Sequence, residues 1–229
     1  MPDKKASRIL LASNSQGTSA GVAQDQNYPS ILQERLGSEF EVHRILISGW
    51  TLRDLSNNLT DNVLSMAPDF VVMHFGIIES AQRILSNWEK RLLSLLPGGG
   101  SITGLLHHNR AAVLKLRNSL GLQVRQVSFR EYSASVRDVA DCLDRLQIPY
   151  LFLRTPLFPD QGDALGHPFI NQDVTKFNGA LDGYESLSCD ACDGEWTMDD
   201  YQPGTVHFSE AGHRKIAEML KREMMYRLR

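Results

Sequence analysis

The sequence predicts an α/β protein in which helices cover both faces of a parallel sheet, forming a three-layer sandwich. Short apolar runs alternate with longer segments of helical spacing along most of the chain. Strands that alternate with helices are usually parallel, because each crossover helix returns the chain to the same end of the sheet. The composition agrees with this class: 229 residues, 42% of them hydrophobic and 22% charged, are typical of a globular protein with its own core.

Four apolar runs, each followed by small or polar residues, are predicted as strands. They cover residues 8–13, 40–47, 70–75 and 150–154. Parallel strands place their carboxyl ends at one edge of the sheet, and ligands bind there in open α/β sheets. The loops of interest at that edge are residues 13–18, 48–50, 76–80 and 155–156.

The spacing of apolar residues predicts the helices. They cover residues 28–36, 51–66, 79–96, 101–121, 130–146, 172–187 and 209 to the C-terminus. Thr51 and Ser209 are the expected N-caps of two of these helices, because a hydroxyl can accept a hydrogen bond from a free N–H group of the first turn. There is no internal repeat or linker, so residues 1–229 are expected to form one domain.

Charge and hydropathy argue against several classes of partner. The chain has 24 basic and 27 acidic residues, a net charge of −3. This balance gives no electrostatic reason to expect a nucleic acid or an anionic membrane as a partner. No apolar run reaches the roughly 18 residues of a membrane helix. The run at residues 9–12 is too short for a signal peptide, and the chain is therefore expected to be cytoplasmic.

The three cysteines cannot form a disulfide framework. Cys189 and Cys192 form a C-x-x-C pair, but zinc normally requires four ligands and the chain has no second pair. A loop clip or two free thiols is expected there. Neither a metal nor a cofactor is predicted.

Several basic side chains are predicted to be mainly solvated charges on helix surfaces, with one or two of them facing the rim of a binding site. They are Arg83, Arg110, Arg117 and Arg125. His107 and His108 are predicted to begin a helix rather than to bind a ligand.

Ser15 follows the first predicted strand, at the edge where ligands bind. It can be a nucleophile, or residues 13–19 can form an ordinary polar turn or a phosphate-binding loop. The segment lacks the glycine patterns of nucleotide-binding loops, which disfavours the last alternative. A nucleophilic serine also needs a neighbouring base, since a hydroxyl is a weak nucleophile at neutral pH.

His207 lies just before the last predicted helix. A single histidine in that position can be structural or solvated. However, the final helix of an α/β sandwich can pack beside the first strand, which would bring His207 toward Ser15. The two residues are therefore a candidate base and nucleophile.

Four short blocks follow the first three strands or precede the last helix. They are Ser13-Asn14-Ser15, Gly49, Gly76-Ile77-Ile78-Glu79, and Gly204-Thr205-Val206-His207 with Gly212-His213 beyond it. In this order and placement the chain resembles the SGNH/GDSL hydrolases, a superfamily of serine esterases and acyltransferases. The resemblance spans the whole chain and implies a flavodoxin-like sandwich.

The sequence departs from the pattern of this superfamily at three positions. Asn14 replaces the aspartate of the first block, Ile78 replaces the asparagine whose amide helps to bind the oxyanion, and Gly204 replaces the triad aspartate. The G-I-I-E block resembles a branch with G-I-V-D at this place, often encountered with polysaccharide genes. That branch has a helical insertion after the third strand, which would correspond to residues 84–125 here.

The resemblance implies acyl transfer through Ser15, with His207 as base. The backbone N–H groups of Ser15 and Gly49 would bind the oxyanion. Asp200 is the preferred third member of the triad, with Asp199 or a Ser–His dyad as alternatives. The expected substrate contacts are Asn14, Trp50, Gly76, Ile78 and Glu79. Trp50 can belong to the core or stack on a sugar ring.

Two functions of different classes remain. The first is an ester hydrolase or O-acyltransferase that acts on a small-molecule ester, with an acylated carbohydrate as the expected substrate. The second is a protein with the same fold and pocket that binds a ligand without turnover, which the replacements at Ile78 and Gly204 favour.

Overall fold

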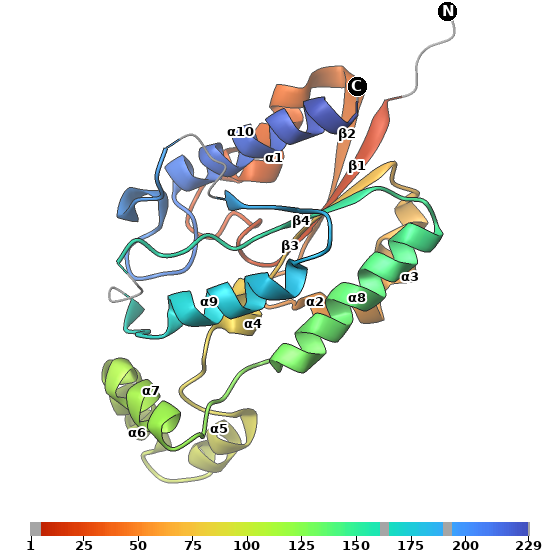
Figure 1. Cartoon of the computed structure of the whole chain (residues 1–229). Coiled ribbons are helices and arrows are strands. Elements are labelled where there is room, and N and C mark those ends of the chain that lie inside the picture. Colours follow the sequence, from red (N-terminus) through yellow and green to blue (C-terminus); the bar gives the residue numbers. More distant parts are fainter. Residues whose placement is uncertain (1–5, 161–164, 190–193, 229) are drawn as a thin grey trace, which may run out of the picture.

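The protein is a sandwich built on a five-stranded parallel sheet (Figure 1). The structure is a computed structural model that describes residues 6–160, 165–189 and 194–228. The strand order is β2-β1-β3-β4-β5. The strands are β1 (Ser7–Ser13), β2 (Phe40–Leu46), β3 (Phe70–His74), β4 (Tyr150–Leu153) and β5 (Ser186–Leu187). The predicted three-layer α/β class is confirmed.

Ten α-helices connect or cover the described strands. They are α1 (Tyr28–Leu36), α2 (Leu52–Asn57), α3 (Leu59–Asn62), α4 (Ile77–Ser80), α5 (Asn87–Ser94), α6 (Gly99–His108), α7 (Arg110–Ser119), α8 (Phe129–Arg145), α9 (Ile170–Asn178) and α10 (Glu210–Arg227). Within the described residues no helix combines the length and apolarity needed to cross a bilayer.

The alternating side chains of β1 separate two cores. Ile9 and Leu11 of β1 belong to a core that includes side chains from α1 and α10, whereas Leu10 and Ala12 belong to a second core with α2 and α8. All four side chains are fully buried. A strand that is buried on both faces has a continuous apolar sequence, which is why residues 9–12 contain no polar side chain.

The register of β1 brings the loops of interest to one place. Ser13, the last residue of β1, pairs with Leu46 of β2 and with His74 of β3. The chain therefore leaves three neighbouring strands at the same level, between β1 and β3, where the strand order reverses its direction. Such a switch point is the usual binding site in this topology.

Four predicted helices differ from the observed elements. The helix expected over 51–66 is divided into α2, α3 and a 3₁₀ turn, and the expected N-cap Thr51 is confirmed. The helix expected over 79–96 is replaced by α4, a non-helical segment and α5. The helix expected over 101–121 is divided at Asn109 into α6 and α7. The prediction over 172–187 was wrong at its C-terminal end, because residues 186–187 form β5.

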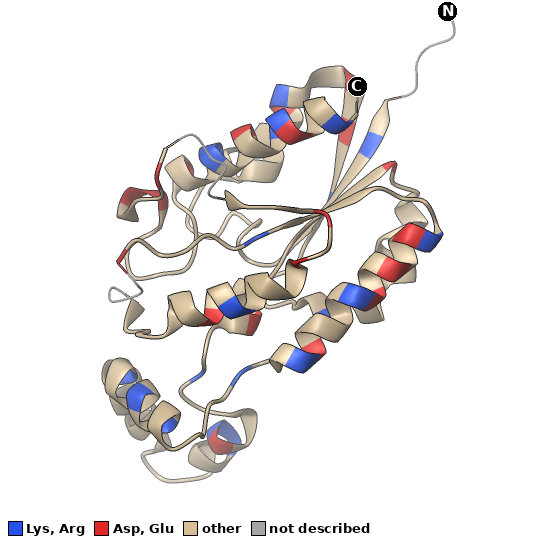
Figure 2. Cartoon of the chain, in the orientation of Figure 1, with Lys and Arg blue, Asp and Glu red and all other residues tan. Residues whose placement is uncertain are grey.

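Helices α5, α6 and α7 lie together at one end of the molecule, beyond α4 and α9 (Figure 1). Residues 84–125, which contain these helices, have one acidic side chain, Glu89, and six basic side chains. Figure 2 shows the resulting excess of Lys and Arg on this part of the chain. The segment therefore differs in charge from the protein as a whole.

The close approach of α10 to residues 198–200 depends on Gly212. A Cβ atom at position 212 would overlap the backbone carbonyl oxygen of Asp200. The predicted N-cap Ser209 is confirmed, since its hydroxyl accepts a hydrogen bond from Gly212 N at 3.4 Å. The glycine thus lets α10 begin against the turn that precedes His207.

We expect Gly212→Ala to lower the free energy of unfolding by about 1–3 kcal/mol, the usual cost of overpacking a close contact. Gly104→Ala is the matched control, because Gly104 also lies in a helix but has no atom within 4 Å of the added Cβ. The control is expected to gain up to about 1 kcal/mol from helix propensity. Urea unfolding measures both, and equal effects of the two changes would contradict the role assigned to Gly212.

Candidate active site

Ser15 lies in a tight turn directly after β1 and is 8% exposed. The turn is closed by hydrogen bonds from Gly17 N to Asn14 O at 3.0 Å and from Thr18 Oγ1 to Ser15 O at 2.8 Å. Among the described residues, neither the hydroxyl nor the backbone N–H of Ser15 has a hydrogen-bond partner. Both groups therefore keep an unused hydrogen-bonding capacity within the described part of the chain.

His207 is held in a short loop that leads into α10. Residues 201 and 208 form an isolated antiparallel bridge, and Gln202 N donates to His207 O at 2.9 Å inside it. His207 N donates to Thr205 Oγ1 at 3.1 Å. The backbone of the histidine is thus fixed on both sides, as a loop that positions a base requires.

A hydrogen bond joins the loop of Ser15 to the loop of His207. Gln16 Nε2 donates to Val206 O at 3.3 Å, across 190 positions of sequence. The neighbours of the two predicted catalytic residues are therefore in direct contact. The structure brings the two loops together, but it contains no hydrogen bond between Ser15 Oγ and His207.

Asp200 does not contact His207. Its carboxylate is 3% exposed, and Oδ2 accepts from Lys215 Nζ at 2.7 Å and from Thr197 N at 2.8 Å. These contacts tie α10 to the 3₁₀ turn at Met198–Asp200. His207 Nδ1 is buried and has no hydrogen-bond partner among the described residues. The geometry thus gives Asp200 a structural role in place of the predicted role in a triad.

The environment of His207 favours the neutral imidazole. Burial lowers the pKa of His207 below its ordinary value of 6.5. Burial, and secondarily the nearby His207, lowers the pKa of His213 to about 4. His213 Nδ1 accepts from Tyr28 N at 3.3 Å, so it too is held neutral. A neutral imidazole at position 207 can accept a proton at neutral pH.

Glu79 connects the loops that follow β2 and β3. Its side chain is fully buried; Oε1 accepts from Leu52 N at 2.6 Å and Oε2 from Gly76 N at 3.0 Å. Both oxygens are engaged with backbone N–H groups at the starts of α2 and α4. This corrects the expected substrate contact at Glu79: the carboxylate positions the loops that follow β2 and β3.

Gly49 presents a free N–H group at the mouth of the sheet. Its φ of +83° lies in the region that favours glycine, and its carbonyl accepts from Gln126 Nε2 at 3.2 Å. The N–H has no backbone acceptor among the described residues. Trp50 packs, partly buried, against the core that contains α2 and α8. It does not line the cavity described below, so the structure does not support the expected sugar contact there.

Asn14 and Gly76 are buried parts of the loop architecture. Asn14 is fully buried and its Oδ1 accepts from Gln16 N at 3.1 Å. Gly76 has a φ of +122°, and a Cβ atom there would lie 3.0 Å from Thr155 Oγ1. Asn14 Nδ2 is buried without a hydrogen-bond partner in the described part of the chain, and the substrate contacts expected at the two positions stay predictions. Ile78, in contrast, is partly buried and lines a cavity.

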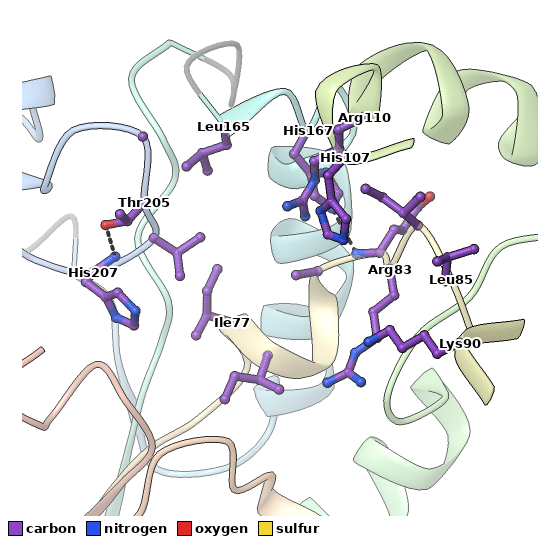
Figure 3. A pocket seen from close by; sticks show the side chains of 16 residues that line it. Ile77, Arg83, Leu85, Lys90, His107, Arg110, Leu165, His167, Thr205 and His207 are labelled. Atoms are coloured by element: carbon purple, nitrogen blue, oxygen red, sulfur yellow. Dashed lines mark hydrogen bonds between the residues drawn. The ribbon is translucent and has the colours of Figure 1, made fainter. Parts of the chain in front are cut away.

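A cavity of about 420 Å³ opens between α4, the His207 loop and the α5–α7 segment (Figure 3). His207 and Ile78 are the predicted site residues that line it. Ser15 and Gly49 do not line it, so the cavity begins beside the Ser15–His207 pair and extends away from it. Its apolar lining includes Ile77, Ile84, Leu85, Leu165 and Val206.

Most residues that form the cavity wall were not predicted from the sequence. It is formed in part by Arg83, Lys90, His107, Arg110 and His167. Of the four arginines considered from the sequence, one or two were expected to face the rim of a binding site, and Arg83 and Arg110 line the cavity. The other two form ion pairs: Arg117 with Glu89 at 2.8 Å and Arg125 with Asp173 at 2.6 Å. The useful signal in the sequence was the shortage of acids in residues 84–125.

The described residues contain no group of three or more His, Cys, Asp or Glu side chains that could hold a metal ion. Cys189 is buried and its Sγ donates to Arg154 O at 2.8 Å. Cys192, the other member of the C-x-x-C pair, lies outside the described residues.

We expect Glu79→Gln to lower the free energy of unfolding by about 1–3 kcal/mol, because the amide NH₂ cannot accept from one of the two N–H groups. Burial raises the pKa of Glu79 from 4.5 to about 7. Because the pKa is higher in the folded state, the protonated carboxyl group stabilises the wild-type fold. This stabilisation is complete below pH 4.5 and is lost as the pH rises through about 7. The destabilisation by Glu79→Gln is therefore larger at pH 5 than at pH 8. Urea unfolding of both proteins at the two pH values tests this, and a loss that grows with pH would contradict it.

No protein-family model matches the sequence, and no curated protein matches it. The structure is nevertheless similar over nearly its whole length to solved structures of esterases and lipases. The lipase/acylhydrolase from Enterococcus faecalis has a TM-score of 0.63 and 14% identity, covering 96% of each chain. A protein assigned to the G-D-S-L lipolytic family from Desulfitobacterium hafniense has a TM-score of 0.59 and 11% identity, covering 94% of this chain and 98% of that one.

An acetylxylan esterase from Geobacillus stearothermophilus, in the form of a catalytic mutant, has a TM-score of 0.57 and 18% identity, covering 96% of each chain. Identities this low establish the fold alone. The strand order and these similarities together show that the chain has the SGNH hydrolase fold, as the sequence resemblance implied.

Proposed function

We propose that the protein is a serine-dependent esterase or O-acyltransferase that acts through an acyl-enzyme on Ser15. The observation that carries this proposal is the hydrogen bond from Gln16 to Val206, which joins the Ser15 and His207 loops on an SGNH hydrolase fold. The free Ser15 hydroxyl and the neutral His207 are the nucleophile and base that ester cleavage requires.

The proposed reaction has two acyl-transfer steps. Ser15 Oγ attacks the ester carbonyl carbon while His207 takes the hydroxyl proton. The tetrahedral intermediate then expels the alcohol, which leaves with the proton from His207. In the second step water, or a second alcohol, attacks the acyl-enzyme and gives its proton to His207. The acid or the new ester is released, and the proton returns to Ser15 Oγ.

We assign a Ser–His dyad to this site rather than a triad. His207 Nδ1 has no partner among the described residues, and the carboxylate of Asp200 is bound to Lys215. A dyad lacks the negative charge that stabilises the imidazolium formed during the reaction. Loss of the acid's charge in a known serine-protease triad lowers kcat by about 10⁴. The proposed enzyme is therefore expected to be slow with simple esters.

The backbone N–H groups of Ser15 and Gly49 are the proposed oxyanion donors. Neither N–H has a backbone acceptor among the described residues. Ile78 provides no third donor in the place of the asparagine amide, and one such donor contributes about 10²–10³ in rate. The partly buried Ile78 side chain instead makes the cavity wall apolar.

An acylated carbohydrate is the proposed substrate class. Two observations support it: the sequence resembles a branch found with polysaccharide genes, and one similar structure is an acetylxylan esterase. A ligand-binding protein without turnover is the second candidate. The missing Ser15–His207 hydrogen bond and the unpartnered His207 Nδ1 favour it.

Ser15→Ala and His207→Ala are each expected to lower kcat/KM for p-nitrophenyl acetate to the background rate, because nucleophile and base act as a unit. A fluorophosphonate probe should label the wild type at Ser15. Ser38→Ala and His108→Ala, both at exposed positions outside the site, are controls that keep full activity. Wild-type protein that is folded but neither hydrolyses esters nor reacts with the probe would support the binding protein instead.

The pH profile should show the neutral imidazole directly. Since burial lowers the pKa of His207, kcat/KM is expected to rise with pH along a limb whose midpoint lies below pH 6.5, and to be flat at neutral pH.

Gly204→Asp restores the acid that the superfamily has three residues before the histidine. Gly204 has a φ of +68° and open space around its Cβ position, and Asp tolerates this conformation better than most residues.

Gly204→Asp is expected to raise kcat and to move this midpoint upward, because a carboxylate near Nδ1 stabilises the imidazolium. Gly204→Asn, which has the same shape without the charge, is the control. An identical profile for both variants would show that the carboxylate does not reach His207.

A further inference from the structure

The cavity beside His207 has a cationic wall. Figure 3 shows His207 on one side and Arg83, Lys90 and Arg110 on the other, with Ile77 between them. No Asp or Glu is among the described residues that line the cavity. Three permanent positive charges therefore face a space that contains no described negative charge.

Arg110 is the most informative of the three. Its side chain is partly buried, and its Nε is fully buried without a hydrogen-bond partner in the described part of the chain. Burial lowers the pKa of Arg110, which shows the cost of holding its charge there. A partly buried cation without an anion is unfavourable, and an anionic ligand would remove that penalty.

The basic residues of the same segment that serve structure have acidic partners. Arg117 forms hydrogen bonds of 2.8–3.1 Å with Glu89, and Arg125 pairs with Asp173 at 2.6 Å. Arg110 and Lys90 form no ion pair among the described residues. Arg83 forms a hydrogen bond to Gln126, which is neutral and leaves its charge uncompensated. Arg91 and Lys115 of this segment also form no ion pair among the described residues, but both are exposed and do not line the cavity. Arg110 is the partly buried cation that the cavity leaves without an acidic partner in the described part of the chain.

The histidine beside Arg110 does not change this balance. Burial, and secondarily Arg110, lowers the pKa of His167 to about 4. His167 Nε2 accepts from Gln82 N at 2.9 Å, so its ring is neutral and fixed. It neither repels nor replaces an anion at neutral pH.

The surface between His207 and the cationic wall is apolar. Ile77, Ile78 and Ala81 of the α4 region and Leu165 line this part of the cavity. A ligand that reaches both ends therefore needs an ester group at the His207 end, an apolar middle and an anionic group at the far end. A pocket of about 420 Å³ is large enough for a small molecule of this kind.

We propose that the site selects esters that carry an anionic group, a carboxylate or a phosphate, separated from the scissile carbonyl by a short apolar segment. Arg110, with Lys90 and Arg83, binds the anion, while His207 and Ser15 act on the ester. This inference rests on the proposed esterase function. The anion can belong to the acyl part or to the alcohol part of the ester, and the experiment separates the two.

The test compares matched pairs of esters that differ only in charge. For the acyl part, these are the p-nitrophenyl monoesters of succinic, glutaric and adipic acid and the same compounds with the free carboxyl methylated. For the alcohol part, they are 4-acetoxybenzoate and its methyl ester. Wild-type kcat/KM is expected to be at least about tenfold higher for the anionic member of one pair, equivalent to 1.4 kcal/mol. No preference in any pair would overturn the proposal.

Arg110→Gln is expected to remove most of that preference by lowering kcat/KM for the anionic esters, and Arg110→Lys to retain part of it. Lys115→Gln is the matched control, because Lys115 is exposed on the same helix and does not line the cavity. If the Tm shows that Arg110→Gln does not fold, Lys90→Gln becomes the test variant. Arg91→Gln is then its control, because Arg91 lies on the same helix but does not line the cavity. A preference that survives the cavity variants, or that falls equally in the controls, contradicts the assigned site.

A binding measurement separates this proposal from the esterase assignment. Calorimetric titration of the Ser15→Ala protein with p-nitrophenyl adipate is expected to show binding that weakens about tenfold in the Arg110→Gln background. This result does not depend on turnover. Absence of Ser15-dependent hydrolysis would contradict the esterase function alone. Hydrolysis with no charge preference, together with equal binding by both backgrounds, would contradict the anion site alone.

Discussion

The register of β1 with its two neighbours is the constraint on which the candidate site depends. Ser13 pairs with Leu46 and with His74, so the chain leaves three adjacent strands at the same level. Glu79 then links the loops after β2 and β3, because its two oxygens accept from Leu52 N and Gly76 N. A shift of one residue in β1 would turn each of its side chains toward the opposite core and separate these groups.

Below the Ser15 loop the protein contains a buried polar cluster that is kept uncharged. Tyr28 Oη and His74 Nδ1 lie 3.2 Å apart, and Tyr28 N donates to His213 Nδ1 at 3.3 Å. Burial lowers the pKa of His74 to about 3 and, with His207 as a second cause, that of His213 to about 4. Histidines that remain neutral can accept hydrogen bonds in the core without introducing charge. The rings of His74 and His213 both pack against Phe208, the residue that follows His207 in the chain.

Some charged side chains of the protein form ion pairs within the fold, and others do not. Asp200 would be a plausible partner for a catalytic histidine, but Lys215 binds its carboxylate and this pair fixes the start of α10. Among residues 84–125, Arg117 and Arg125 are paired with acids, whereas the partly buried Arg110 forms no ion pair with any described residue. An ion pair that is satisfied within the fold contributes to shape, and a charge that is left unsatisfied at a cavity is available to a ligand.

The sequence by itself determined the α/β class, four of the five strands, the capping residues Thr51 and Ser209, and the order of the blocks that carry Ser15 and His207. These features are local, since they depend on apolar runs, on helix starts and on residues adjacent to strand ends. Only the tertiary structure decided the rest. β5 has two residues, too few for a periodic signal, and its pairing with β4 defines it. Lys215 binds Asp200 and Leu52 N binds Glu79 from other elements, while Arg110 has no ion-pair partner among the described residues. The sequence pattern does not encode which groups meet across such distances.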